Sequence, residues 1–344
     1  MRIAVALLLV AASIGAACAD DGSDTRGSAG VDDIQVPDGY AVEIVVEGLS
    51  GPTQVALGPD RGLVVAELNG AERAGTGRVL LIDLDDPTTR RTLVDALLTP
   101  TGVAVDGDLL WIMEQRRLTV GPIAEPTDRT VVLDDLPYNG RSEGTISAVA
   151  GGGILYDTSG RLQGGRLAEG AGALWYLAGP DSEPVQYATG FKHAYAHTPV
   201  DDTRWFVTEI SDGRLDGRVP PDELVIAASG DDFAFPRCIG DRVPVAEFGG
   251  TAANCAGSPR SLAVFAPGST PTSVVVAPWD PEFVLVALWN QAQVVAVPAS
   301  PVGQPHSGAP FLSGIEHPQV LLADGARLLV VDFDSGRVLA VTAQ

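Results

Sequence analysis

Six short apolar runs of this sequence end in a polar residue, and these residues are its first candidates for chemistry. Five of the six are carboxylates, and carboxylate oxygens are ligands that hard cations such as Ca²⁺ prefer. The alternative is that carboxylates at strand ends cap turns or lie in solvent. The six residues are Glu67, Glu114, Asp157, Glu209, Asn290 and Asp332.

Each run is preceded by a second apolar strand, and the loops that lead into these strands carry a second set of polar candidates. Binding residues concentrate on such loops. If the two sets meet, their carboxylates and basic groups would form a pocket for an ion or a polar ligand. No Ser-His-Asp arrangement favours a nucleophilic mechanism, and His197 and His306 are expected to be peripheral. The loop residues are Gln54, Thr101, Arg141, Lys192, His193, His317 and Gln319.

The elements that must position these residues form a repeat. Each unit has a first apolar strand, a turn rich in Gly, Asp or Pro, the run with the polar end, and a third strand. The units recur about every 45 to 50 residues, except for one interval near 80. Three or four antiparallel strands per unit are typical of a propeller blade. We therefore predict an all-β, six-bladed β-propeller of four-stranded antiparallel blades over 36–344; a β-sandwich is the alternative.

Blade geometry predicts that both sets of polar residues surround one mouth of the central channel. The first strand of each blade lines the channel, and the second strand returns to the face where the first began. One leftover strand, at 41–49, precedes the first unit. We expect it to pair with the last strand, at 336–343, because this pairing closes the ring and protects a sheet edge.

The first 35 residues predict export. Arg2 precedes an apolar run over 3–14, which suits a signal peptide and is shorter than the roughly 20 residues of a spanning helix. Small residues then lead to Cys18, as in a lipoprotein signal peptide over 1–17 in which Cys18 becomes the acylated residue; an ordinary cleavage site is the alternative. The polar stretch 18–35 indicates a flexible acidic tether. We expect an extracytoplasmic protein, lipid-anchored to the bacterial cell membrane.

The charge and the cysteine content of the chain limit the classes of partner that it can bind. A net charge of −22 and a single lysine, Lys192, exclude nucleic acid, because little could neutralise a phosphate backbone. Cys238 and Cys255 lie 17 positions apart in a segment rich in Pro and Gly, and in an exported protein this pair predicts a disulfide. A metal site, the alternative, would need further soft ligands nearby. We expect a monomer that binds a small polar ligand such as a sugar.

Three segments resemble one family. They are PDGYAVEIVVEGLSGPTQVALGPDRGLVVAE at 37–67, GFKHAYAHTPVDDTRWFVTE at 190–209 and DELVIAASGDDFAFPRC at 222–238. They resemble the soluble PQQ-dependent glucose and sorbosone dehydrogenase-like propellers, most specifically over 190–238. The resemblance implies a six-bladed propeller that holds pyrroloquinoline quinone (PQQ) and Ca²⁺ at the channel mouth and oxidises sugar hydroxyls. The implied cofactor contacts are Gln54, Thr101, Lys192 and His193, and the implied metal ligands are Glu209 and Asp212.

The chain departs from this family where the chemistry would be. Arg141 stands at the position of the histidine general base, and a protonated arginine cannot take a hydroxyl proton. His193 and Glu143 are the alternative bases. Lys192 and His193 replace the Arg-Asn pair that grips the quinone, which removes the planar two-pronged donor. The segments 99–102 and 233–236 also differ from the family pattern.

These departures predict a degenerate active site and a propeller that acts by binding a ligand at its mouth. Two alternatives stay open. The first is an active quinoprotein that dehydrogenates a sugar or aldose. The second is a Ca²⁺-dependent propeller hydrolase or lactonase, in which the metal polarises a carbonyl.

Overall fold

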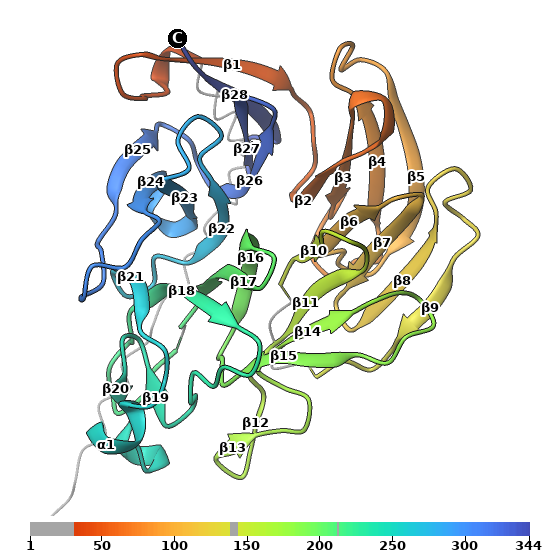
Figure 1. Ribbon diagram of the computed structural model, residues 1–344. Helices are drawn as coiled ribbons and strands as arrows, with labels where there is room; N and C mark the ends of the chain where they lie inside the picture. Colours follow the sequence, from red (N-terminus) through yellow and green to blue (C-terminus); the bar gives the residue numbers. More distant parts are fainter. Residues whose placement is uncertain (1–30, 138–143, 212) are drawn as a thin grey trace, which may run out of the picture.

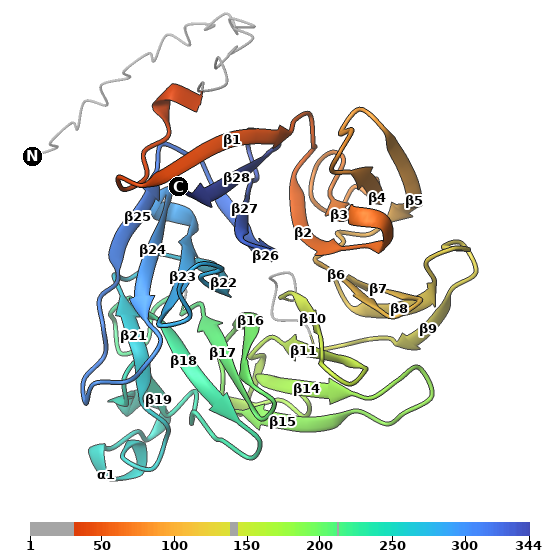
Figure 2. The ribbon, with the colours of Figure 1, turned by 45° about the horizontal axis from the view of Figure 1, so that its top comes forward.

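Six four-stranded antiparallel sheets are arranged as blades around a central channel (Figures 1 and 2). The computed structural model describes residues 31–137, 144–211 and 213–344. This architecture confirms the predicted six-bladed propeller. In each of blades 1 to 5, the chain runs from the channel outward, one strand after the next.

The first three blades contain the strands β2 to β11, β14 and β15. In blade 1 these are β2 (Pro52–Leu57), β3 (Gly62–Glu67), β4 (Gly77–Asp83) and β5 (Arg90–Leu97). In blade 2 they are β6 (Gly102–Asp106), β7 (Leu109–Glu114), β8 (Arg117–Pro122) and β9 (Thr130–Leu133). In blade 3 they are β10 (Ile146–Ala148), β11 (Ile154–Thr158), β14 (Ala173–Leu177) and β15 (Val185–Thr189).

The last three blades complete the ring. Blade 4 contains β16 (Ala194–Asp201), β17 (Arg204–Glu209), β18 (Asp222–Ala228) and β21 (Ser261–Phe265). Blade 5 contains β22 (Pro271–Val276), β23 (Phe283–Leu288), β24 (Gln293–Pro298) and β25 (Ala309–Ser313). Blade 6 contains β26 (Pro318–Asp324), β27 (Arg327–Asp332), β28 (Arg337–Ala343) and β1 (Tyr40–Val46).

The core lies in the seams between blades, which explains the apolar runs of the second strands. Side chains alternate between the two faces of a strand, and both faces of a blade are covered by neighbours. Leu63 and Val65 of β3 therefore pack toward blade 6, whereas Val64 and Ala66 pack toward blade 2. All four side chains are fully buried, so the strand reads as a continuous apolar run rather than an alternating one.

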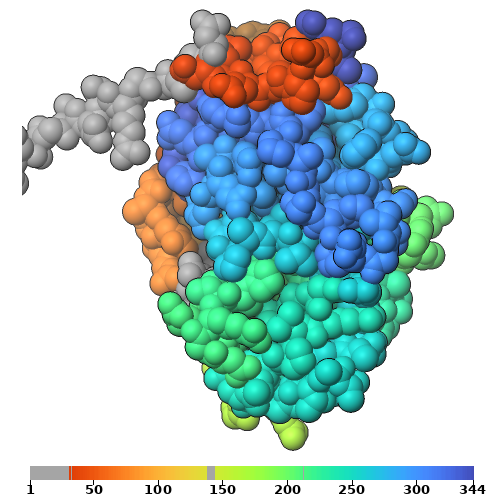
Figure 3. All heavy atoms as spheres, turned by 90° about the vertical axis from the view of Figure 1, so that its left-hand side faces the viewer, coloured from red at the N-terminus to blue at the C-terminus, as the bar shows by residue number. Residues whose placement is uncertain are grey.

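The two ends of the described chain meet in blade 6. Strand β1 pairs antiparallel with β28, from Tyr40 opposite Ala343 to Val46 opposite Val338. Figure 3 shows this first strand, in red, against the C-terminal segments, in blue. The pairing predicted between the leftover strand and the last strand is confirmed. It covers the outer edge of the last blade with a strand of the same chain.

Loops on the mouth side of blades 3 and 4 build a small lobe (Figure 1). The disulfide between Cys238 and Cys255, predicted from the sequence, is present in it, and Leu215 packs with Phe235 in its apolar centre. No helix in the described ranges is long and apolar enough to cross a membrane. The lobe contains β12 (Leu162–Gln163), β13 (Arg166–Leu167), β19 (Cys238–Ile239), β20 (Val243–Pro244), η3 (Ala246–Phe248) and α1 (Ala252–Cys255).

Candidate functional site: the channel mouth

The polar residue that ends a second strand holds the loop that leads into the first strand of the same blade. Within the described residues, four carboxylates accept a backbone N–H of that loop, whereas the Asn290 side chain donates to Gly268 O at 2.9 Å. These bonds confirm the turn-capping alternative for the four carboxylates. They run from Ser50 to Glu67 (2.8 Å), Leu98 to Glu114 (2.7 Å), Lys192 to Glu209 (2.6 Å) and His317 to Asp332 (2.8 Å).

Glu209 lies beside a second buried acid. Its register partner on β18 is Glu223, whose carboxylate accepts a hydrogen bond from Ser261 Oγ, and both glutamates are almost fully buried. Burial raises the pKa of Glu209 well above its ordinary value, and the charge of Glu223 raises it further. Burial likewise raises the pKa of Glu223 to about 7.

Gln54 ties three blades together inside the channel. Its Oε1 accepts the N–H groups of Val103 (2.6 Å) and Ile146 (3.2 Å), and its Nε2 donates to Ile146 O (2.8 Å). The first strands expose one backbone edge to the channel, and these bonds satisfy part of that edge. Gln54 thus serves blades 1, 2 and 3 at once.

A second amide, Gln319, forms the floor of the channel mouth. Its Nε2 donates to Thr53 O (3.1 Å) and to Tyr195 Oη (2.8 Å), which joins blade 6 to blades 1 and 4. Gln319 and Tyr195 line a mouth cavity of about 630 Å³. The residues that follow them in their strands, Val320 and Ala196, line an inner cavity of about 320 Å³.

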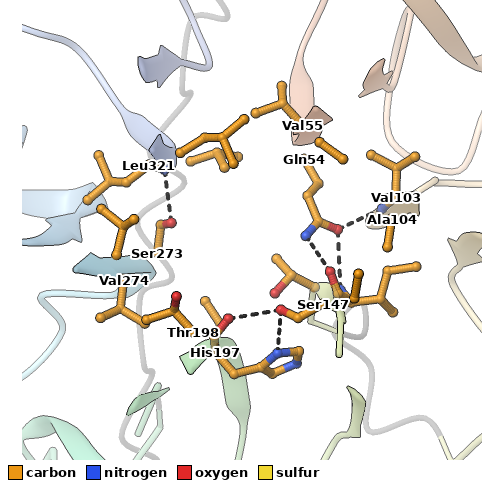
Figure 4. A pocket seen from close by; sticks show the side chains of 18 of the residues that line it. Gln54, Val55, Val103, Ala104, Ser147, His197, Thr198, Ser273, Val274 and Leu321 are labelled. Atoms are coloured by element: carbon orange, nitrogen blue, oxygen red, sulfur yellow. Dashed lines mark hydrogen bonds between the residues drawn. The ribbon is translucent and has the colours of Figure 1, made fainter. Parts of the chain in front are cut away.

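Several polar groups of the inner cavity bond to groups of neighbouring strands (Figure 4). Ser147 Oγ donates to His197 O at 2.9 Å and lies 2.7 Å from His197 Nδ1, and Ser273 Oγ accepts the N–H of Leu321 at 2.9 Å. Burial lowers the pKa of His197 to about 4, so its imidazole is neutral at physiological pH. These side chains of the inner cavity therefore hold neighbouring blades together through hydrogen bonds.

The mouth cavity has an aromatic wall. Trp289, at the start of η4 (Trp289–Gln291), lines it. The indole is stacked on His317, with ring centroids 4.5 Å apart and planes at 20°, and meets Phe333 at 5.0 Å. These contacts fix the plane of the half-buried indole at the edge of the cavity.

Polar side chains complete the mouth. His193 is mostly buried, meets Tyr195 edge to face at 5.2 Å, and places Nε2 3.9 Å from Oδ2 of the buried Asp157. Asn290 and Arg73 also line the cavity. Gly213 and Val219 extend it toward the lobe.

The structure separates the predicted site residues. His193 lines the mouth, and Lys192 adjoins it, because Lys192 Nζ lies 3.9 Å from the position that a Cβ on Gly213 would take. Gln54 lies in the inner cavity. Thr101 is buried, and its hydroxyl has no hydrogen-bond partner among the described residues. Arg141 and Asp212 lie outside the described residues, so their roles stay predictions.

Sequence reasoning missed Trp289, Tyr195 and Arg73. Trp289 immediately precedes Asn290, which ends the second strand in the sequence pattern, so the aromatic residue beside a predicted mouth residue was a usable signal. Tyr195 lies two positions after His193, near the start of the first strand β16, which begins at Ala194. Arg73 belongs to a loop between second and third strands, which the repeat pattern does not place at the mouth.

The fold defines a class: six-bladed β-propellers, here with a cavity at the channel opening. No protein-family model and no curated protein matches the chain. Solved structures do share its fold. A carbohydrate-active enzyme of family AA12 from Trichoderma reesei, in its calcium structure, superposes with a TM-score of 0.73 at 15% identity, over 90% of this chain and 97% of that chain.

Two further solved structures share the fold. The PQQ domain of pyranose dehydrogenase from Coprinopsis cinerea, in its holo form, has a TM-score of 0.71 at 14% identity, over 90% of this chain and 97% of that chain. A gluconolactonase from Xanthomonas campestris has a TM-score of 0.56 at 16% identity, over 89% and 90%. The chain thus has the fold of sugar-dehydrogenase propellers with a strongly divergent sequence.

Among the described residues, only part of the cofactor contacts that the resemblance implies lie at the mouth cavity. No group of three or more His, Cys, Asp or Glu side chains among them could hold a metal ion, and a backbone N–H occupies Glu209 Oε1. Of the four expected quinone contacts, Gln54 uses its amide to join blades, and Thr101 does not line the cavity. We therefore derive no step through a quinone or a metal.

Proposed function

We propose that the mouth cavity binds a small polar ligand of the sugar class, at a site that has lost the quinoprotein reaction. The observation that carries this proposal is the clamped indole of Trp289 beside Asn290, His193 and Gln319 in one cavity. An aromatic face packs against the C–H face of a pyranose ring, and the polar groups satisfy its hydroxyls. A cavity of about 630 Å³ is large enough for a monosaccharide or a disaccharide.

Sugar binding by Trp289 is tested with calorimetry and indole fluorescence. We expect the wild-type chain to bind at least one aldose, and Trp289→Ala to weaken that binding at least about tenfold, whereas Trp289→Phe retains most of it. Phe283→Ala is the matched control, because Phe283 is an exposed aromatic residue at the opposite end of the strand that leads to Trp289. Equal affinities for the wild type and Trp289→Ala would refute the assigned site.

An active quinoprotein remains the second candidate, because the fold is shared with a holo PQQ domain. The purified chain is mixed with PQQ and Ca²⁺, and absorbance and dye-linked oxidation of glucose and xylose are followed. The degenerate site predicts neither a bound-quinone spectrum nor turnover. Turnover that disappears on removal of Ca²⁺ would overturn the degenerate-site proposal. Hydrolysis of gluconolactone is followed in the same samples, as a test of the lactonase alternative.

The proposed location is the outer surface of the bacterial cell membrane, where Cys18 would anchor a monomeric propeller through its acyl chains. One acyl chain binds a membrane only marginally, and two or more bind it stably. We expect the wild-type protein in the membrane fraction and Cys18→Ala in the soluble exported fraction or retained as precursor. Recovery of mature Cys18→Ala protein in the membrane fraction would argue against the anchor.

A further inference from the structure

An imidazole that lines the mouth cavity lies beside a buried carboxylate from a different blade. Asp157 ends β11 in blade 3, and His193 leads into β16 in blade 4; Nε2 and Oδ2 are 3.9 Å apart. Their side chains are only 1% and 7% exposed, respectively. A buried carboxylate beside an imidazole orients the ring.

The backbone of blade 3 passes close to the Asp157 carboxylate at Gly144. A Cβ on Gly144 would lie 2.3 Å from Asp157 Oδ1 and 2.3 Å from Tyr195 O. The N–H of the next residue, Thr145, donates to that same Tyr195 carbonyl at 2.8 Å. Only a residue without a side chain lets blade 3 pass this close to the carboxylate and to blade 4.

A proton donor lies next to the imidazole. Tyr195 lines the same cavity, and its Oη accepts a hydrogen bond from Gln319 Nε2 at 2.8 Å, which leaves its own proton available for a ligand. Burial raises the pKa of Tyr195 to about 12, so the phenol keeps its proton at physiological pH. A base and an acid with 5.2 Å between ring centroids therefore face one ligand cavity.

We propose that His193, oriented by Asp157, and Tyr195 are a general base and a general acid that interconvert the two anomers of the sugar bound at the mouth. This inference rests on the proposed sugar site. The reaction uses no oxidant, reductant or second substrate. It therefore needs neither a quinone nor a metal.

The step balances on the sugar and two side chains. The imidazole takes the proton of the anomeric hydroxyl, and the electrons of that O–H bond form the carbonyl at C1. The bond between C1 and the ring oxygen breaks, and the ring oxygen takes the phenolic proton of Tyr195, whose oxygen Gln319 then stabilises. Rotation about the C1–C2 bond and reversal of the transfers give the other anomer and restore both side chains.

The test follows the approach of α-D-glucose and α-D-xylose to anomeric equilibrium by polarimetry and by NMR exchange, in EDTA. Wild-type protein should accelerate the exchange in proportion to its concentration and saturate at the sugar affinity measured by fluorescence. His193→Gln and Tyr195→Phe should lose at least about a hundredfold of that acceleration at saturating sugar, and Asp157→Asn at least about tenfold. The sugar affinity of each variant is measured separately, so that weaker binding is not mistaken for lost exchange.

Matched controls separate chemistry from folding. His306→Gln and Tyr176→Phe change the same residue types away from the mouth and should retain full acceleration. Sugar binding by the wild type with exchange only at the buffer rate would overturn this inference and leave the proposed sugar site intact. Unchanged acceleration in His193→Gln would also overturn it. Absence of any sugar binding would refute the sugar site itself, and the inference with it.

Discussion

At the scale of single residues, Glu209 and Glu223 show how burial and charge act on the same pair. They face each other across β17 and β18 with almost no solvent exposure. Two carboxylates this close cannot both ionise cheaply, so their protons leave in two steps that belong to the pair. Burial thus raises the pKa of both groups, and a neutral carboxyl can donate a hydrogen bond that a carboxylate cannot.

Glu223→Gln should make the protein more stable at alkaline pH. Burial raises the pKa of Glu223 from 4.5 to about 7 in the folded state, so its stabilising contribution is complete below pH 4.5 and is lost as the pH rises through 7. Glutamine keeps the acceptor for Ser261 and does not ionise. From pH 4.5 to pH 8, the free energy of unfolding of the variant should increase relative to that of the wild type by on the order of 1–3 kcal/mol.

Urea unfolding at both pH values measures this gain. Glu282→Gln, at an exposed position, is the control and should show no pH-dependent difference from the wild type. A wild-type stability that is flat from pH 5 to pH 8 would contradict the shifted pKa of Glu223.

Residue types were predictable at the mouth, whereas their partners were not. The polar ends of the second strands follow from a repeat in the sequence, and this repeat predicted Glu67 and Glu209 as mouth residues. The backbone N–H groups that they accept lie 17 positions earlier in the chain, in the loops that lead into the first strands. The distance between Asp157 and His193 depends on how two blades pack, and a spacing of 36 residues along the chain does not fix it.

At the scale of elements, the first strands do two jobs that the sequence pattern does not distinguish. Some of their polar side chains face the mouth cavity, and others fasten neighbouring strands. Gln54 and Gln319 are both glutamines in first strands, yet Gln54 makes three hydrogen bonds to blades 2 and 3. Gln319 reaches blades 1 and 4 and also lines the mouth. Strand alternation and the depth of each residue in the channel decide between these jobs.

Gln54→Leu should destabilise the fold and leave sugar affinity nearly unchanged. The substitution leaves two buried N–H groups and one carbonyl without their partner, which costs on the order of 2–4 kcal/mol after water has entered the inner cavity. The measurement is urea unfolding together with fluorescence titration of sugar. Gln163→Leu, on the exposed β12, is the control. Lost sugar affinity at full stability would instead make Gln54 a ligand contact.

At the scale of the whole molecule, the blade count and the closure in blade 6 were predictable because each blade repeats one strand order. The lobe that holds Cys238 and Cys255 was not predictable beyond its disulfide, because it interrupts the repeat. Its short strands and single-turn helix have no periodicity long enough to read. The mouth cavity extends toward this irregular part, through Gly213 and Val219.

Removal of β1 should destabilise the entire ring. A chain that starts at residue 47 loses Val42, Ile44 and Val46 from two interblade clusters and exposes the edge of β28. Burial of such side chains contributes on the order of 1.5–3 kcal/mol each, so the melting temperature should fall by on the order of 10 °C. A chain that starts at residue 31 is the matched control. Equal melting temperatures would show that β1 does not close the ring.

The pairing of β1 with β28 also determines when, during synthesis and folding, the ring can close. Tyr40 and Ala343 are about 300 residues apart in the chain, so one of the earliest strands to be synthesised has no partner until the final strand appears. Contacts of such long range form slowly, because a large loop must close before they are gained. During that interval β1 presents a bare strand edge, which is a template for pairing with another chain. We therefore expect closure of the ring by β1 and β28 to be a late step in the folding of this protein.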